Sequence, residues 1–483
     1  MDSSISNVSS PRETISTVRL VIAYALMIAA TIGLFFVILS YGNALSPSAG
    51  ASANMTVPAG VVHKSDALYH VLLALVLILL LGRWLGKLFV YFGQPRVIGE
   101  MVAGIMLGPS LLGRIWPEAM HFILPQDVQP FLGIIAQIGV ILYMFLVGLE
   151  LNAGLLRSRA HSTIAISHAS IVTPFLLGGL LALWLFPHLG TPGVPFTSFA
   201  LFMGVAMSIT AFPVLARILT DRHMENSELG VIALSCAAVD DVTAWCLLAF
   251  VVGVARAEVG SAVETTLLAL AFIAIMFVIV RPLAVRHLGH DSYHPQRRMT
   301  VWVLVALLFS ALTAEWIGIH AIFGAFVLGA IIPHDSDIAR DFQHKLEDIV
   351  KILLLPAFFA YTGMRTEIGL VSGWQAWLFC AVIILVATLG KFGGTLVAAR
   401  LTGLGWRTSA ALGILMNTRG LMELIVLNIG LELGVISPKL FAMMVIMALV
   451  TTIATTPILH ALTRVEAAGH NVASASGRRG QHA

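Results

Sequence analysis

Ala237-Ala-Val-Asp-Asp-Val-Thr-Ala-Trp-Cys246 places two adjacent carboxylates, Asp240 and Asp241, in the middle of an apolar run over residues 229–254. A run of that length crosses a bilayer as a helix. An Asp at mid-membrane costs roughly 2.5 to 3.5 kcal/mol on insertion scales, and such residues usually mark ion or proton pathways. The pair therefore indicates a transport site. The alternative is a packed ion-pair network with no transport role.

The composition is that of a polytopic all-α membrane protein. The chain is 58% hydrophobic and 11% charged, against roughly 25% charged residues in an ordinary soluble domain. Its net charge of +3 gives no reason to expect a nucleic-acid partner. The three cysteines lie in apolar segments without zinc-type spacing, so neither a disulfide framework nor a resident metal or other cofactor is expected.

The apolar segments predict one extra N-terminal helix and 13 core helices. The extra helix, residues 20–39, is longer than a signal-peptide core, although a cleaved signal peptide is the alternative. We divide the chain into an extra helix and linker (1–65), a transmembrane domain (66–463) and a disordered cytoplasmic tail (464–483). The core helices are expected at residues 66–89, 96–113, 131–151, 162–186, 197–219, 229–256, 263–286, 298–316, 318–334, 349–366, 374–398, 408–430 and 437–463.

Basic residues gather on one side of this predicted topology. If the segments alternate in direction, 21 of the 28 Lys and Arg residues fall on one side and five on the other, while two lie within helices. The positive-inside rule then places both termini in the cytoplasm. We expect a multi-pass protein of the plasma membrane, or of the inner membrane in a bacterium. The longest cytoplasmic loop, residues 334–350, mixes both charge signs and is expected to form a surface helix.

Two blocks of the chain repeat the same organisation. Glycine-rich segments ended by Pro109 and Pro333 open them, and the fourth segment of each block is interrupted by polar or Pro/Gly residues. Paired interruptions at matching positions point to the binding site of a secondary transporter. Because the opening segments are predicted to run in opposite directions, the two five-helix repeats are expected to be inverted, each with one broken helix.

The interruptions contain the groups that an ion site needs. Where residues 208–213 unwind, backbone carbonyls and the hydroxyls of Ser208 and Thr210 lose helical partners and can face a cavity. In the second interruption Arg419 and Glu423 stand four residues apart and are expected to neutralise each other as structural charges. Arg365 is likewise expected to be structural, near an outer helix end.

Together these motifs resemble the monovalent cation:proton antiporter-2 family, and in particular its plant-type cation/H+ exchanger branch. The resemblance covers residues 66–463. The motifs that carry it are Gln94-Pro-Arg-Val-Ile-Gly-Glu-Met-Val-Ala-Gly-Ile-Met-Leu-Gly-Pro109, Ser208-Ile-Thr-Ala-Phe-Pro213, Val239-Asp-Asp-Val242, Ile317-Gly-Ile-His-Ala-Ile-Phe-Gly-Ala-Phe326 and Met416-Asn-Thr-Arg-Gly-Leu-Met-Glu-Leu424.

The resemblance implies a homodimeric, thirteen-helix antiporter whose core domain moves against a dimerisation domain. Asp241 resembles the carboxylate that binds cation and proton in turn, with Asp240 as its neighbour. Thr210 resembles the hydroxyl at the broken helix. Lys391 resembles the intramembrane lysine that pairs with the first aspartate.

Adjacent helical residues point about 100° apart, so the two acids are expected to divide their tasks. Asp241 would face a cavity where H+ and Na+ or K+ compete, while Asp240 faces Lys391. The lysine is either part of the exchange or a neutralising partner, and the exchange is correspondingly electrogenic or electroneutral.

Two other classes of protein also contain acids or polar groups at membrane depth. An intramembrane aspartyl protease needs carboxylates that face each other from different helices, and no enzymatic activity is expected here. A cation channel or leak pathway would need a continuous pore.

Overall fold

The computed structural model describes residues 17–42, 64–150, 160–220, 222–224, 227–256, 259–288, 296–333 and 336–479. Within these ranges the regular structure is helical, apart from an isolated bridge between Gly190 and Ile436. Ten of the described helices are long and apolar enough to cross a membrane. The predicted linker after the first helix lies largely outside the described residues.

The first half of the chain carries the N-terminal helix and the first repeat. Its elements are α1 (Thr17–Gly42), α2 (Lys64–Tyr91), α3 (Arg96–Leu107), the short α4 (Leu112–Ile115) and α5 (Pro117–Ile123), η1 (Gln126–Val128), α6 (Gln129–Glu150), α7 (Ala160–Leu189), α8 (Phe196–Ser208), α9 (Phe212–Thr220) and α10 (Glu228–Arg256).

The second half carries the connecting helix and the second repeat. Its elements are α11 (Val259–Ile275), η2 (Met276–Val280), α12 (Arg281–Leu288), α13 (Gln296–Ile317), α14 (Ala321–Ile331), α15 (Asp337–Ile349), η3 (Val350–Leu354), α16 (Leu355–Met364), η4 (Ile368–Leu370), α17 (Gly373–Thr388), η5 (Leu389–Gly393), α18 (Gly394–Leu401), α19 (Trp406–Met416), α20 (Leu421–Glu432) and α21 (Pro438–Arg479).

Every predicted apolar segment contains a helix, and the all-α prediction is confirmed. The two segments with polar interruptions are broken, into α8 and α9 and into α19 and α20. The predicted surface helix is α15, whose exposed Lys345 lies 2.5 Å from Asp341 one turn earlier. The last helix continues to Arg479, and the disordered tail expected at 464–483 stays a prediction.

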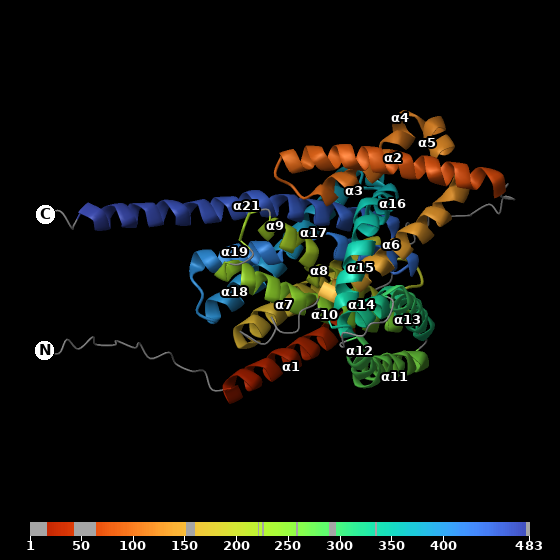
Figure 1. The fold of residues 1–483 in the computed structure, drawn as a ribbon. Coiled ribbons are helices and arrows are strands. Elements are labelled where there is room, and N and C mark those ends of the chain that lie inside the picture. The colour runs from red at the N-terminus through yellow and green to blue at the C-terminus, as the bar shows by residue number, and fades with distance from the viewer. Residues whose placement is uncertain are drawn as a thin grey trace, which may run out of the picture.

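The helices pack in two groups. In one group α2, α3, α6, α13, α14 and α16 contact one another, and in the other α7, α8, α10, α17, α18, α19 and α21 do. Figure 1 shows α2, α3 and α16 on one side of the molecule and α7, α18 and α19 on the other. We call these groups the scaffold and the core. Helix α20 belongs to the same broken segment as α19 and contacts α8 and α21 of the core and α16 of the scaffold.

Glycines at two equivalent crossings hold the scaffold together. A Cβ on Gly104 of α3 would lie 2.3 Å from the Ala360 carbonyl oxygen on α16, and a Cβ on Gly329 of α14 would lie 2.2 Å from that of Phe145 on α6. The first helix of each block thus packs against the second helix of the other block. Such reciprocal contacts are what a two-fold relation between two repeats produces, and they fit the predicted inverted repeat.

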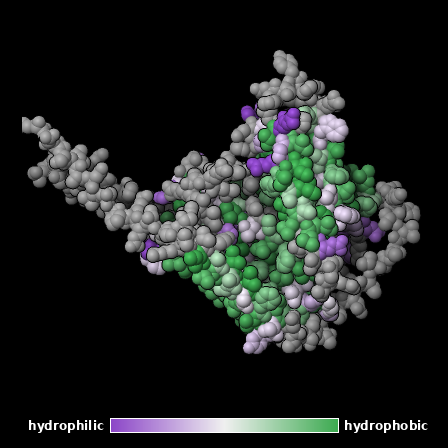
Figure 2. Space-filling model, turned by 90° about the horizontal axis from the view of Figure 1, so that it is seen from below, coloured by the Kyte–Doolittle hydropathy of each residue, from purple (hydrophilic) through white to green (hydrophobic). Residues whose placement is uncertain are grey.

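The outside of the bundle is apolar. Trp302, Leu308, Phe309, Leu312 and Trp316 of α13 are 60–77% exposed. Figure 2 shows hydrophobic side chains over much of the described surface in that view. In water so much exposed apolar surface would be unfavourable, whereas hydrocarbon tails solvate it, and the helical fold satisfies the backbone hydrogen bonds inside each segment.

Candidate functional site

The two helix breaks meet in the core. Residues 209–211 separate α8 from α9, and residues 417–420 separate α19 from α20. The backbone N–H of Ala211 donates to the carbonyl of Thr418 at 3.0 Å, so one break satisfies a polar group of the other. Non-helical backbone at membrane depth needs such partners. The contact joins the two breaks, and Thr210 of the first break lies beside Asp240 of α10.

Asp240 lies next to this crossing and is completely buried. Its Oδ1 accepts a hydrogen bond from Ser167 Oγ at 2.6 Å, and its Oδ2 lies 2.7 Å from Ser170 Oγ. The same Oδ2 is 2.9 Å from Thr210 Oγ1 and 3.0 Å from Lys391 Nζ. Four polar groups from three other segments therefore surround one carboxylate, which keeps its charge compensated.

Lys391 and Thr210 are held to each other as well as to Asp240. Lys391 Nζ donates to Thr210 Oγ1 at 2.6 Å, and this hydroxyl lies 3.1 Å from the Met416 carbonyl at the end of α19. The Lys391 side chain is 0% exposed. The network thus joins α7, α10, the first break, α19 and η5.

Small residues bring Lys391 close enough to form this network. Lys391 lies in η5, a π-helical turn, and π-bulges are frequent at functional sites. A Cβ on Gly390 would lie 2.8 Å from Pro174, and one on Gly394 would lie 2.7 Å from the Thr173 hydroxyl. The two glycines therefore let this segment approach α7 closely.

Asp241 differs from its neighbour in every contact. It is 2% exposed, and no described residue donates a hydrogen bond to either of its side-chain oxygens. A buried polar group without a partner is rare in proteins and calls for an explanation. The helical rotation between consecutive residues is the geometric cause, because it turns Asp241 away from the serines and the lysine that hold Asp240.

Arg419 connects the second break to the end of α8. Its guanidinium donates to the carbonyls of Ala206 and Met207 at 2.8 and 2.7 Å, and to Glu423 Oε2 at 2.7 Å. The last carbonyls of a helix lack intrahelical partners and carry partial negative charge. Arg419 supplies both missing donors and the opposite charge, as the predicted structural role requires.

The structure brings together most of the residues that the sequence singled out. Asp240, Thr210 and Lys391 contact one another, and Arg419 pairs with Glu423. Ser208 does not join them, because its hydroxyl lies 2.7 Å from the Gly204 carbonyl and 3.0 Å from that of Ile171. A role for Ser208 in cation binding stays a prediction.

Three residues that contact Asp240 or Arg419 were missed from the sequence. Ser167 and Ser170 are three residues apart on α7, a spacing that puts both on one helix face. That spacing was the available signal. The Thr452 hydroxyl of α21 accepts a hydrogen bond from the backbone N–H of Arg419 at 3.2 Å and donates to the backbone carbonyl of Arg419 at 2.6 Å. A threonine in an apolar helix usually bonds its own backbone, so nothing in the sequence indicated this contact.

Comparisons with known proteins identify the family of this chain. Residues 71–464 match the family model for the transmembrane sodium/hydrogen exchanger. The Na(+)/H(+) antiporter NhaS4 of Synechocystis sp. is 45% identical over 82% of this chain and 97% of its own length. Cation/H(+) antiporter 20 of Arabidopsis thaliana is 39% identical over 80% of this chain. The match covers 47% of that relative's own length, so this chain spans about half of it.

Among solved structures, the sodium proton antiporter MjNhaP1 of Methanocaldococcus jannaschii aligns with a TM-score of 0.59 at 16% identity. The alignment covers 83% of this chain and all of that one. At that identity the likeness shows the fold, and the relatives and the family model identify the chain. The protein belongs to the sodium/hydrogen exchanger family of multi-pass membrane transporters.

Proposed function

We propose that this protein exchanges a monovalent cation, Na+ or K+, for H+ by alternating access, and that Asp241 is the carboxylate that binds the two in turn. The observation that carries the proposal is the contrast within the acid pair. Asp240 is occupied by four polar partners, whereas both Asp241 oxygens lack a hydrogen-bond donor among the described residues. A carboxylate in that position can take a proton or a desolvated cation without breaking another contact.

Asp240 and Lys391 would form the fixed electrostatic background of this exchange. The Lys391 ammonium, 3.0 Å from Asp240, compensates the charge of that carboxylate. H+ and a cation would occupy the same carboxylate oxygens of Asp241, so the two ligands are mutually exclusive. Thr210, which contacts both members of the pair, would fix their geometry at the break.

The acid pair does not favour proteolysis. Asp240 and Asp241 stand on one helix, and the surroundings of Asp240 are filled by two serines, a threonine and a lysine. A proteolytic dyad needs two carboxylates that share one proton across a water. This geometry favours exchange over proteolysis.

The proposal extends to the orientation, the transport domain and the oligomeric state of the protein. We propose that both termini are cytoplasmic, that residues 66–463 are the transport domain in a plasma or inner membrane, and that the protein is a homodimer. The basic residues of the predicted cytoplasmic loops support this orientation. Labelling of tags at each terminus in intact and permeabilised cells tests it.

Transport in everted vesicles tests the role of Asp241. With an imposed pH gradient, wild-type protein should collapse the gradient on addition of Na+ or K+, and Asp241→Asn should reduce this to the level of empty vesicles. Thr243→Val is the matched control, since Thr243 lies on the same helix and its hydroxyl donates to the Val239 carbonyl at 2.9 Å. Wild-type exchange by Asp241→Asn contradicts the assignment.

The same vesicles separate exchange from a leak and define the ion. A channel would pass cations without moving protons, whereas an exchanger acidifies or alkalinises the lumen in response to a cation gradient. Repeating the assay over each alkali cation, with the membrane potential clamped and unclamped, gives selectivity and stoichiometry.

A further inference from the structure

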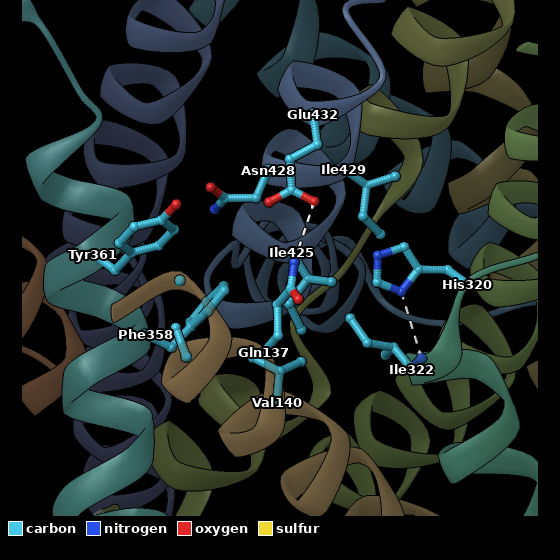
Figure 3. A pocket seen from close by; sticks show the side chains of 12 residues that line it. Gln137, Val140, His320, Ile322, Phe358, Tyr361, Ile425, Asn428, Ile429 and Glu432 are labelled. Carbon is cyan, nitrogen blue, oxygen red and sulfur yellow. Dashed lines mark hydrogen bonds between the residues drawn. The ribbon is translucent and has the colours of Figure 1, made fainter. Parts of the chain in front are cut away.

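A small cavity lies between the scaffold and α20 (Figure 3). It is bounded by α6, the start of α14, α16 and α20. Its apolar wall includes Val140, Phe358 and Ile425. Gln137 and Glu432 point into it from opposite sides in Figure 3, with Asn428 one turn before Glu432 on α20.

Polar contacts bridge α20 to the scaffold beside this cavity. Arg365, at the end of α16, places its Nη1 3.2 Å from Glu432 Oε1 and 3.2 Å from Asn428 Oδ1. The Gln137 amide on α6 donates to Glu432 Oε2 at 3.4 Å. Two scaffold helices thus hold the last residue of α20 by its two carboxylate oxygens.

Helix α20 connects the contacts of Glu432, which we call the bridge, to the second helix break. Helix α20 is one rod of 12 residues that begins just after the break and ends at Glu432. Asn428 ties the preceding turn to α16, because its amide donates to Thr362 Oγ1 at 2.8 Å. Asn428 and Glu432 therefore hold one end of α20 to the scaffold, and the helix break lies at its other end. Helix α20 cannot move away from the scaffold until these contacts separate.

The strength of the bridge suits a contact that opens and closes. The Arg365 and Glu432 side chains are 23% and 34% exposed, so water reaches both. Ion pairs of this kind contribute little net stability, whereas separating a fully buried pair such as Lys391 and Asp240 is strongly unfavourable. The bridge can therefore bias one conformation without locking it.

We propose that Arg365, Gln137 and Glu432 form the outer gate of the exchange pathway, which separates when Asp241 becomes accessible from the extracytoplasmic side. This inference rests on the proposed exchange function and orientation, in which the ends of α16 and α20 face outward. Separation frees the Glu432 carboxylate at the mouth of the cavity and leaves it available to an arriving cation. Closure returns it to Arg365 and Gln137.

Cysteine accessibility tests the gate without relying on transport. Val140→Cys, introduced at the cavity wall of full-length protein whose native cysteines are replaced, is labelled with a membrane-impermeant thiol reagent added from outside. Glu432→Gln and Arg365→Gln should each raise the labelling rate roughly two- to fivefold, the factor expected for loss of a partly exposed ion pair. Arg365→Glu combined with Glu432→Arg should bring the rate back toward wild type.

Glu367→Gln is the matched control, since it removes the same charge two residues from Arg365 on the same side and should leave labelling unchanged. Unchanged labelling in both single variants overturns the gate, as does an equal increase in Glu367→Gln. Gel filtration confirms that each variant is folded. A parallel exchange assay on the same samples separates the two proposals. If the Val140→Cys protein shows no exchange but its labelling still responds to Glu432→Gln and Arg365→Gln, the exchange function is refuted and the gate is not.

Discussion

Asp240 and Asp241 are consecutive residues of α10, yet four polar side chains contact the first and no described residue donates a hydrogen bond to the second. This difference separates two roles. On the proposed exchange model, Asp240 belongs to the structure of the core and Asp241 binds H+ and the cation in turn.

Removal of the Asp240 charge should destabilise the protein. Asp240→Asn leaves the Lys391 ammonium buried without its counter-charge, and breaking one side of a buried pair costs about 3 to 5 kcal/mol. We expect a clear fall in the melting temperature of the purified protein in detergent. Asp241→Asn should leave the melting temperature unchanged or raise it, because an amide is easier to bury than an unpaired carboxylate.

The double variant Asp240→Asn with Lys391→Met provides the control for this prediction. Replacing a whole buried pair is often close to neutral, so the double variant should recover much of the lost stability. If it melts as low as Asp240→Asn alone, the Lys391 contact is not the cause of the loss.

The two serines of α7 should matter through Asp240. Ser167→Ala and Ser170→Ala each remove one hydrogen bond to a buried charge, worth about 1.5 to 3 kcal/mol. We expect lower melting temperatures and slower exchange. Ser310→Ala is the comparison, since its hydroxyl is also buried but donates to the Gly324 carbonyl at 2.7 Å, in the scaffold. Equal slowing of exchange in that variant would argue against a positioning role for the serines.

Arg419 should not be replaceable by lysine. Its planar fork reaches two carbonyls of α8 and the Glu423 carboxylate together, a geometry that an ammonium cannot reproduce. Arg419→Lys should lower stability by about 2 kcal/mol, the scale of one charged hydrogen bond. Arg83→Lys, at an exposed site of α2, should change the melting temperature little. A melting temperature like wild type in Arg419→Lys would refute the fork as the stabilising feature.

The glycine crossings should not admit even a methyl group. Gly329→Ala places a Cβ 2.2 Å from the Phe145 carbonyl oxygen, and overpacking of this kind costs about 1 to 3 kcal/mol. Gly33→Ala is the control, because nothing lies within 4 Å of a Cβ there and alanine is the better helix former. Melting temperatures of the two variants should move in opposite directions or differ clearly, and equal values would contradict the close crossing.

The sequence determined the depth and order of the helices, the two breaks and the identity of the charged residues in the core. Long apolar runs must become helices in lipid, because only a helix satisfies their backbone hydrogen bonds. An acid, a lysine or an arginine within such a run must find a partner or a function. These rules act along one dimension, so residues 208–213, Asp240, Asp241, Lys391 and Arg419 were recognisable without coordinates.

Only the tertiary structure decided which partners these residues have. The rotation of α10 about its axis sets whether Asp240 or Asp241 faces Ser170, and the close approach permitted by Gly390 sets how far Lys391 reaches. Ser208 turned toward backbone carbonyls, and Arg365, expected only at a helix end, joined Glu432 across two helix groups. Rotation and crossing of helices depend on contacts between segments far apart in the chain, and the pattern within one segment does not contain them.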